Sequence, residues 1–120
     1  MQDFRNLKVW EKAHALALEV YARTKDFPGE ERYALTRQIR RCATSIPTNI
    51  AEGCGRGSDA ELARFLQIAR GSASELEYTL LLARDLGLLK DAAHEALAPP
   101  LSEVQRMLAA LIKKLTAQSS

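Results

Sequence analysis

The chain has 120 residues, of which 47% are hydrophobic and 27% are charged, and its formal net charge is +2. This length suits one domain with a single core, and the composition is that of a globular protein rather than a disordered or membrane protein. No stretch approaches about 18 uncharged apolar residues, and the N-terminus lacks a secretory signal pattern, so we expect a cytoplasmic protein without membrane contact. Cys42 and Cys54 are too few for a disulfide framework, and we expect free thiols.

The first predicted helix covers residues 5–26. Its core face holds side chains spaced three or four residues apart, namely Trp10, Ala13, Ala17, Val20, Tyr21 and Thr24. For Trp10 and Tyr21 we favour packing over a base-stacking role. The helix ends before Pro28 and Gly29, because proline disfavours a helical residue before it and glycine allows the chain to reverse.

The second predicted helix covers residues 30–54. Its apolar stripe spans an arc of about 100° and consists of Leu35, Ile39, Cys42, Ala43, Ile46 and Ile50, continued by Gly53. Because the stripe keeps its phase past Pro47, we expect a kink there rather than an end, with Ser45 bonding the nearby backbone. The glycines that follow, from Gly53 to Gly57, predict a turn in which Cys54 is exposed.

The third predicted helix, residues 58–87, begins with a capping box formed by Ser58 and Glu61. It has a heptad seam of Leu62, Leu66, Ala69, Ala73, Leu76, Leu80 and Ala83, typical of helices packed nearly parallel. The fourth, residues 91–117, has a seam of Leu101, Val104, Leu108, Leu111 and Leu115. Pro99 and Pro100 predict either a break that divides it or a marked bend.

No segment alternates polar and apolar residues in the manner of a strand. Four amphipathic helices joined by short turns predict an all-α fold. We expect one domain over residues 1–120, an up-down-up-down antiparallel four-helix bundle whose second helix is kinked at Pro47.

Four stretches of the sequence contain particular residues that a helical pattern alone does not require. They are F-R-N-L-K-V-W-E-K-A-H (4–14), F-P-G-E-E-R-Y-A-L-T-R-Q-I-R-R (27–41), S-I-P-T-N-I-A-E-G (45–53) and R-F-L-Q-I-A-R-G-S-A-S-E-L (64–76). Together they resemble the four-helix-bundle family of intervening-sequence proteins, which are encoded within insertions in large-subunit ribosomal RNA genes. The same family includes the accessory variability determinants of diversity-generating retroelements.

The resemblance covers roughly residues 4–117. It implies a homopentamer of bundles whose basic surface binds RNA or DNA, and, in the retroelement branch, a reverse transcriptase partner. It also implies that the protein is not an enzyme. The Pro99-Pro100 pair departs from the continuous fourth helix of the family, and the modest net charge departs from the strongly basic retroelement branch.

Two basic rows are the candidate nucleic-acid-binding residues. Arg37, Arg40 and Arg41, which we call the arginine cluster, lie opposite the apolar stripe of the second helix, with Thr44 and Thr48 on the same face. Exposed guanidinium groups suit backbone phosphates. The alternative is a solvated face, or arginines paired with acids of another helix or subunit. The second row, Arg5, Lys8 and Lys12, lies on the polar side of the first helix and would extend the cluster if the two rows joined.

Ile68, Tyr78 and Leu82 lie on the side of the third helix away from its seam, and we predict that they form an oligomer interface. Gly71 marks a close helix crossing or a subunit contact. The alternative is that the three apolar residues are scattered on the surface.

We find no constellation for catalysis, and we expect no cofactor and no metal site. His14 and His94 have no ligand-type neighbours at suitable spacing, and the glycine run after residue 52 lacks the other parts of a phosphate loop. Asn49 and Glu52 are expected to bond backbone groups near the kink or a turn. We therefore predict a non-catalytic, homo-oligomeric nucleic-acid-binding or scaffold protein. The alternative is a protein-interaction module that docks onto a reverse transcriptase or another acidic partner without binding nucleic acid.

Overall fold

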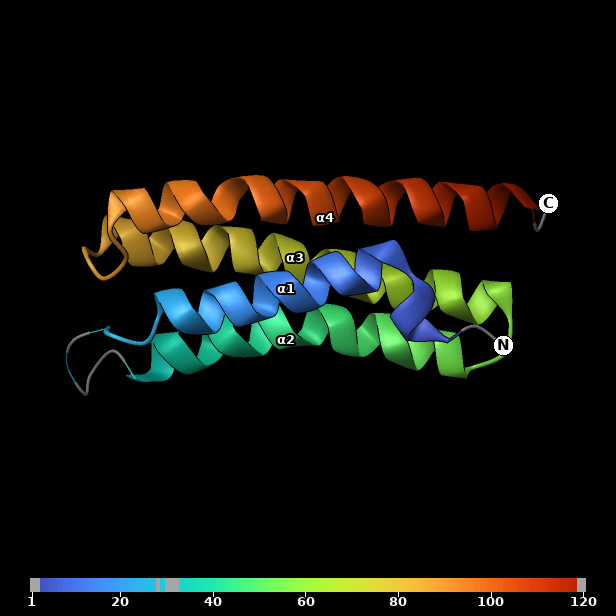
Figure 1. Cartoon of the computed structure of the whole chain (residues 1–120), viewed down its shortest axis with the longest axis horizontal. Coiled ribbons are helices and arrows are strands. Elements are labelled where there is room, and N and C mark those ends of the chain that lie inside the picture. Colours follow the sequence, from blue (N-terminus) through green and yellow to red (C-terminus); the bar gives the residue numbers. More distant parts are fainter. Residues whose placement is uncertain (1–2, 28, 30–32, 119–120) are drawn as a thin grey trace.

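The computed structural model describes residues 3–27, 29 and 33–118. A short 3-10 helix, η1 (Phe4–Asn6), precedes four α-helices: α1 (Lys8–Arg23), α2 (Tyr33–Gly55), α3 (Asp59–Asp85) and α4 (Asp91–Gln118). Successive helices run in opposite directions along a body 49 Å long, and both termini lie at the same end (Figure 1). Each helix packs on two others in cyclic order, α1 on α2, α2 on α3, α3 on α4 and α4 on α1. The predicted all-α, up-down-up-down bundle is confirmed.

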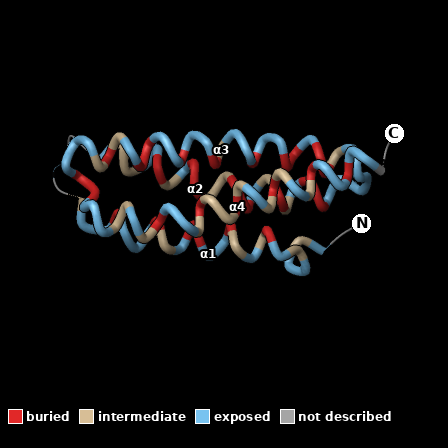
Figure 2. Tube along the Cα trace, turned by 90° about the horizontal axis from the view of Figure 1, so that it is seen from above, coloured by how far each residue is buried: buried red, intermediate tan, exposed pale blue. Residues whose placement is uncertain are grey.

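The core is formed by the inward faces of the helices, which carry the buried residues in Figure 2. All seven predicted seam residues of α3 are buried. In α4 the predicted seam is wrong at one position, since Ile112 is buried and Leu111 is only partly buried. Leu111 instead lines a groove beside Leu7 and Val9, where α4 meets the start of α1. No helix of the described residues is both long and apolar enough to cross a membrane.

The first helix differs from its predicted range of residues 5–26. Leu7 adopts an extended conformation that separates η1 from α1, and α1 ends at Arg23. The expected core face is wrong at Tyr21, which is 44% exposed, whereas Val9 and Leu16 are buried. Tyr21 lies about 100° around the helix from buried Val20, so it falls beside the core rather than in it.

Pro47 lies inside α2, which continues past it to Gly55 as the stripe predicted. Pro99 and Pro100 lie inside α4, so the expected division of that helix is wrong (Figure 1). Leu97 and Leu101, on either side of the prolines, are both buried. Their packing holds both parts of α4 against the bundle and offsets the hydrogen bonds that the prolines remove.

The turn between α2 and α3 is shorter than the sequence suggested. Cys54 is buried in the last turn of α2, contrary to the expectation of an exposed thiol, because it follows Ile50 by four residues on the apolar stripe. Gly57 has a φ of +89°, a conformation that glycine adopts without strain. Ser58 then accepts a hydrogen bond from the backbone N–H of Glu61 at 3.2 Å, which caps α3 as predicted. The carboxylate of Glu61, which was expected to complete a capping box, instead accepts from Arg64 at 2.9 Å.

Both thiols are expected to resist thiol reagents at pH 8. Burial, aided by the carboxylate of Glu75, raises the pKa of Cys42 to about 12, and burial also raises the pKa of Cys54. Because the thiolate is the reactive form, both cysteines should be labelled only as fast as the protein unfolds. A chromogenic disulfide reagent should report two reactive thiols at once in denaturant and almost none in native buffer. Rapid labelling of either cysteine in native buffer would contradict their burial.

Candidate nucleic-acid interface

The arginine cluster lies on the first half of α2. Arg37 and Arg41 are exposed, whereas Arg40 is partly buried against α1. Its guanidinium lies 4.5 Å from the ring centroid of Tyr21, and its Nε donates a hydrogen bond of 3.0 Å to Thr24 Oγ1. A second nitrogen of the guanidinium donates to the carbonyl oxygen of Tyr21 at 3.3 Å. These contacts fix Arg40 at the junction of α1 and α2.

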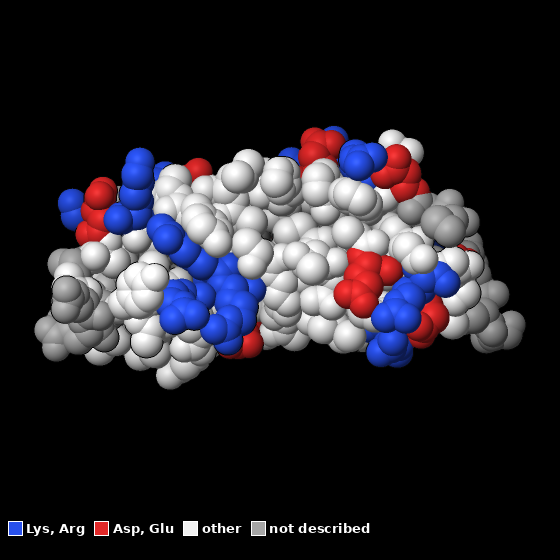
Figure 3. All heavy atoms as spheres, turned by 90° about the horizontal axis from the view of Figure 1, so that it is seen from below, with Lys and Arg blue, Asp and Glu red and all other residues white. Residues whose placement is uncertain are grey.

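None of the three arginines has a carboxylate within 4.0 Å among the residues that the structure describes. By contrast, Arg23, Arg56 and Arg64 pair with Glu19, Glu52 and Glu61 at 3.0, 3.0 and 2.9 Å. Figure 3 shows a group of Lys and Arg side chains toward the end of the molecule where α2 begins, with some acidic side chains beside it, and basic and acidic side chains mixed toward the other end. Among the described residues, three arginines without an ion pair are therefore grouped on the first half of α2.

The second basic row does not join this cluster. Arg5 lies 3.6 Å from Asp3, and Lys12 lies 3.5 Å from Glu103 of α4. Lys8 lines the groove between α1 and α4. Arg40 meets α1 at Tyr21 and Thr24, at least nine residues beyond Lys12, or roughly 13 Å along the helix. The two rows thus lie at different levels of the bundle. Arg5 lies in η1, whereas Lys8 and Lys12 of α1 turn toward α4.

The most specific sequence motifs join α2 to α3. Ser45 Oγ lies 2.8 Å from Ser72 Oγ of α3, rather than bonding the nearby backbone as expected. Asn49 Nδ2 donates to the carbonyl oxygen and the hydroxyl of Ser45, at 2.8 and 3.0 Å, as expected for a group beside the kink. Glu52 does not bond the backbone as expected but pairs with Arg56. Ser45, Asn49 and Ser72 therefore form a polar bridge between two helices rather than a reactive site.

Gly53 completes this junction by allowing α2 and α3 to approach closely. A Cβ at this position would lie 2.8 Å from Phe65 Cβ and 3.0 Å from Leu62 Cδ1, both on α3. Gly71 is different, because a Cβ there would meet nothing within 4 Å. Gly71 therefore marks no helix crossing within one protomer. The other prediction for Gly71, a contact between subunits, stays a prediction.

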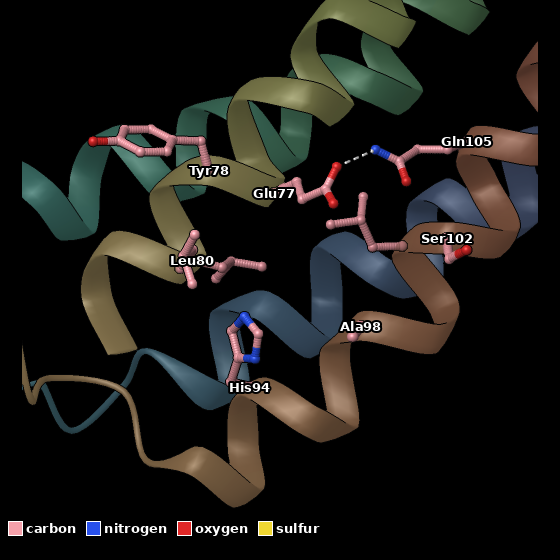
Figure 4. Close-up of a pocket in the computed structure, with 9 residues that line it drawn as sticks. Glu77, Tyr78, Leu80, His94, Ala98, Ser102 and Gln105 are labelled. Carbon is pink, nitrogen blue, oxygen red and sulfur yellow. Dashed lines mark hydrogen bonds between the residues drawn. The ribbon is translucent and has the colours of Figure 1, made fainter. Parts of the chain in front are cut away.

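The predicted interface on α3 is only partly exposed. Ile68 is 43% exposed and Tyr78 60%, whereas Leu82 is partly buried. Leu81, which the sequence pattern did not single out, is 37% exposed and lines a groove of about 470 Å³ between α3 and α4. Figure 4 shows this groove, with Glu77 joined to Gln105 by a hydrogen bond and the ring of Tyr78 directed away from α4. On the side of α3 away from its seam, Ile68 and Tyr78 are thus exposed and Leu82 is partly buried, whereas Leu81 lies on the flank that faces α4.

One solved structure with a similar fold comes from Bacteroides thetaiotaomicron. It is described as a protein of unknown function from the S23 ribosomal protein family, and it is 28% identical in sequence with a TM-score of 0.80. The match covers 88% of the present chain and 98% of that one. No curated protein matches the sequence.

The family model of the 23S rRNA-intervening sequence proteins matches residues 5–110. The match extends from the basic row of α1 through the arginine cluster and the α2–α3 bridge into α4. The chain therefore belongs to the 23S rRNA-intervening sequence protein family.

Proposed function

We propose that this protein is a non-catalytic, homo-oligomeric protein that binds RNA or DNA through phosphate contacts. The observation that carries the proposal is the arginine cluster of α2, whose members have no carboxylate within 4.0 Å among the described residues. Unpaired guanidinium groups on one face recognise the phosphate backbone and read little sequence.

Lys8 is the member of the second row that lacks an ion pair among the described residues, so the α1 side should contribute less than α2. Arg5 and Lys12 would first have to leave Asp3 and Glu103. Both pairs are partly or fully exposed to water, where such bonds are weak. We therefore assign the principal contacts to the arginine cluster and secondary ones to Arg5, Lys8 and Lys12.

Binding of a short labelled oligonucleotide is expected to depend steeply on salt. Each phosphate contact to a single strand adds about −0.7 to the slope of log K against log salt, so three contacts weaken binding roughly 20-fold between 50 and 200 mM. Fluorescence anisotropy at several salt concentrations measures this slope. Absence of binding at 50 mM salt would refute the proposal. It would favour the competing proposal, in which the cluster docks onto an acidic protein such as a reverse transcriptase.

We also propose that protomers associate through the side of α3 that carries Ile68, Tyr78 and Leu82. The mass measured by light scattering should then be a multiple of 13.3 kDa, and five protomers are the expectation. Replacing Ile68 and Tyr78 together with aspartate should give a folded monomer, because charges do not tolerate burial between subunits. Tyr33→Asp serves as the control, since Tyr33 is 65% exposed but lies on α2. A wild-type monomer at tens of micromolar would rule out this interface.

A further inference from the structure

A second feature of the α1–α2 face is a shallow groove of about 410 Å³ beside the arginine cluster. Its lining residues are Trp10, His14, Ala17, Leu18 and Tyr21 of α1 and Thr44, Pro47, Thr48 and Ala51 of α2. Small side chains and a proline occupy the middle of the groove, and aromatic rings stand at both ends. Its volume lies within the range of about 300–1,000 Å³ that is usual for ligand sites.

The rings in the groove offer flat faces, held in place by contacts with one another and with neighbouring side chains. His14 is stacked on Trp10 with ring centroids 5.0 Å apart and planes inclined by 7°. Phe4 supports Trp10 from its edge at 4.8 Å. At the other end, Tyr21 is held beneath the guanidinium of Arg40. These contacts fix the aromatic rings in place, so an incoming flat ligand meets ordered surfaces.

The groove is exposed although its residues are apolar. Leu18 is 60% exposed and Tyr21 is 44% exposed. The hydroxyls of Thr44 and Thr48 donate to the carbonyl oxygens of Arg40 and Thr44, at 3.0 and 2.7 Å. Their oxygens are therefore left to accept hydrogen bonds. The wall of the groove thus suits a flat ring that lies against it by its face, with only a few polar groups to read the edge of that ring.

The arginine cluster lies directly beside this groove. Arg40 forms part of the same junction, and Thr44 follows Arg40 and Arg41 by one helical turn. An occupant must therefore present a flat ring next to negative charge. A nucleic-acid strand supplies both. Basic side chains beside aromatic rings are typical of sites for single-stranded nucleic acid.

We infer that the groove between α1 and α2 receives unpaired bases, so that the protein prefers single-stranded to double-stranded nucleic acid. This inference rests on the proposed function and specifies its ligand. The phosphates contact the arginine cluster, while bases lie against His14, Leu18 and Tyr21. A duplex keeps its bases stacked in its interior and can offer only its phosphates, so it gains nothing from the groove.

Trp10 is the only tryptophan of the chain, so its fluorescence reports on the groove directly. Titration with a 15-nucleotide oligothymidine should quench this fluorescence. A duplex of the same length should bind roughly tenfold or more weakly, since stacking of each base strengthens binding about five- to a hundredfold. The double variant His14→Ala, Tyr21→Leu should lose this preference. Its binding of duplex should change little, because Arg40 keeps its hydrogen bonds to Thr24 Oγ1 and to the backbone carbonyl of residue 21.

Two control variants separate stacking from folding. Tyr78→Leu removes an equally exposed tyrosine from α3, and it should leave both affinities unchanged. The variant His14→Phe, Tyr21→Phe keeps the aromatic rings and should keep the preference. Circular dichroism establishes that each variant is folded.

Equal affinity for both ligands, or no quenching, would overturn the inference and leave phosphate binding intact. A fall in oligomer mass in the variant His14→Ala, Tyr21→Leu would also overturn it, because a second copy would then occupy the groove. If neither ligand binds at 50 mM salt, the proposed function itself fails and the inference fails with it.

Discussion

Replacing Gly53 with alanine is expected to lower the melting temperature by roughly 8 °C, through a loss of about 2 kcal/mol of stability. The new Cβ would lie 2.8 Å from Phe65 Cβ, an atom fixed to the backbone of α3. It cannot be accommodated by a change of rotamer at the far end of a side chain. The two helices must separate, which weakens the packing around the buried Ile50 and Leu62.

Gly55→Ala is the matched control for this prediction. Gly55 lies two residues further along the same helix, and a Cβ there would meet nothing within 4 Å. Alanine should therefore stabilise the protein slightly, by up to about 1 kcal/mol, because it restricts the unfolded chain. Thermal unfolding followed by circular dichroism measures both variants. If Gly53→Ala is as stable as Gly55→Ala, the close approach of α2 and α3 is not required.

The core could be predicted from sequence because burial along a helix follows a local period. The seam of α3 keeps that period from Leu62 to Ala83 without a break, and every predicted seam residue is buried. Residues at the margin of a face are harder to assign. Tyr21 follows buried Val20 directly, and the position of α2 decides whether Tyr21 is buried in the core or lies in the groove beside it.

Contacts between distant segments could not be predicted, since they depend on how each helix is rotated in the bundle. Lys12 fits a basic row on α1 by spacing alone, but the rotation of α1 brings it to Glu103 of α4. Ser45 meets Ser72 for the same reason. The prolines of α4 show the reverse case, in which packing against distant residues overrides a prediction made from local sequence. A local rule predicted either a break or a marked bend, but burial of Leu97 and Leu101 against the bundle keeps α4 undivided.

The sequence contains a pattern that indicates the groove between α1 and α2, but the stronger pattern of core residues on the same helix obscured it. Trp10, His14, Leu18 and Tyr21 are spaced by four, four and three residues, which places them on one stripe beside the buried face. Three of the four are aromatic. A second stripe of this kind, next to an amphipathic core face, indicates a surface with a partner, whereas the core face alone only indicates a bundle.

Replacing Arg37, Arg40 and Arg41 together with alanine is expected to weaken oligonucleotide binding by about a hundredfold or more at 50 mM salt. Each lost contact between a guanidinium and a phosphate removes roughly 1–2 kcal/mol. The slope of log K against log salt should also become shallower by about 2, because three fewer counterions are released. Anisotropy titrations over a range of salt concentrations give both quantities.

A second triple variant separates specific contacts from total charge. Arg56, Arg64 and Arg84 pair with Glu52, Glu61 and Asp85, and their replacement by alanine changes the net charge by the same three units. This variant should bind almost as the wild type does. The double variant Arg37→Ala, Arg41→Ala retains the contacts of Arg40 with Thr24 and Tyr21. It should still lose most of the affinity, so that damage to the α1–α2 junction cannot explain the loss. Equal weakening in both triple variants would mean that overall charge, and not the face of α2, attracts the nucleic acid.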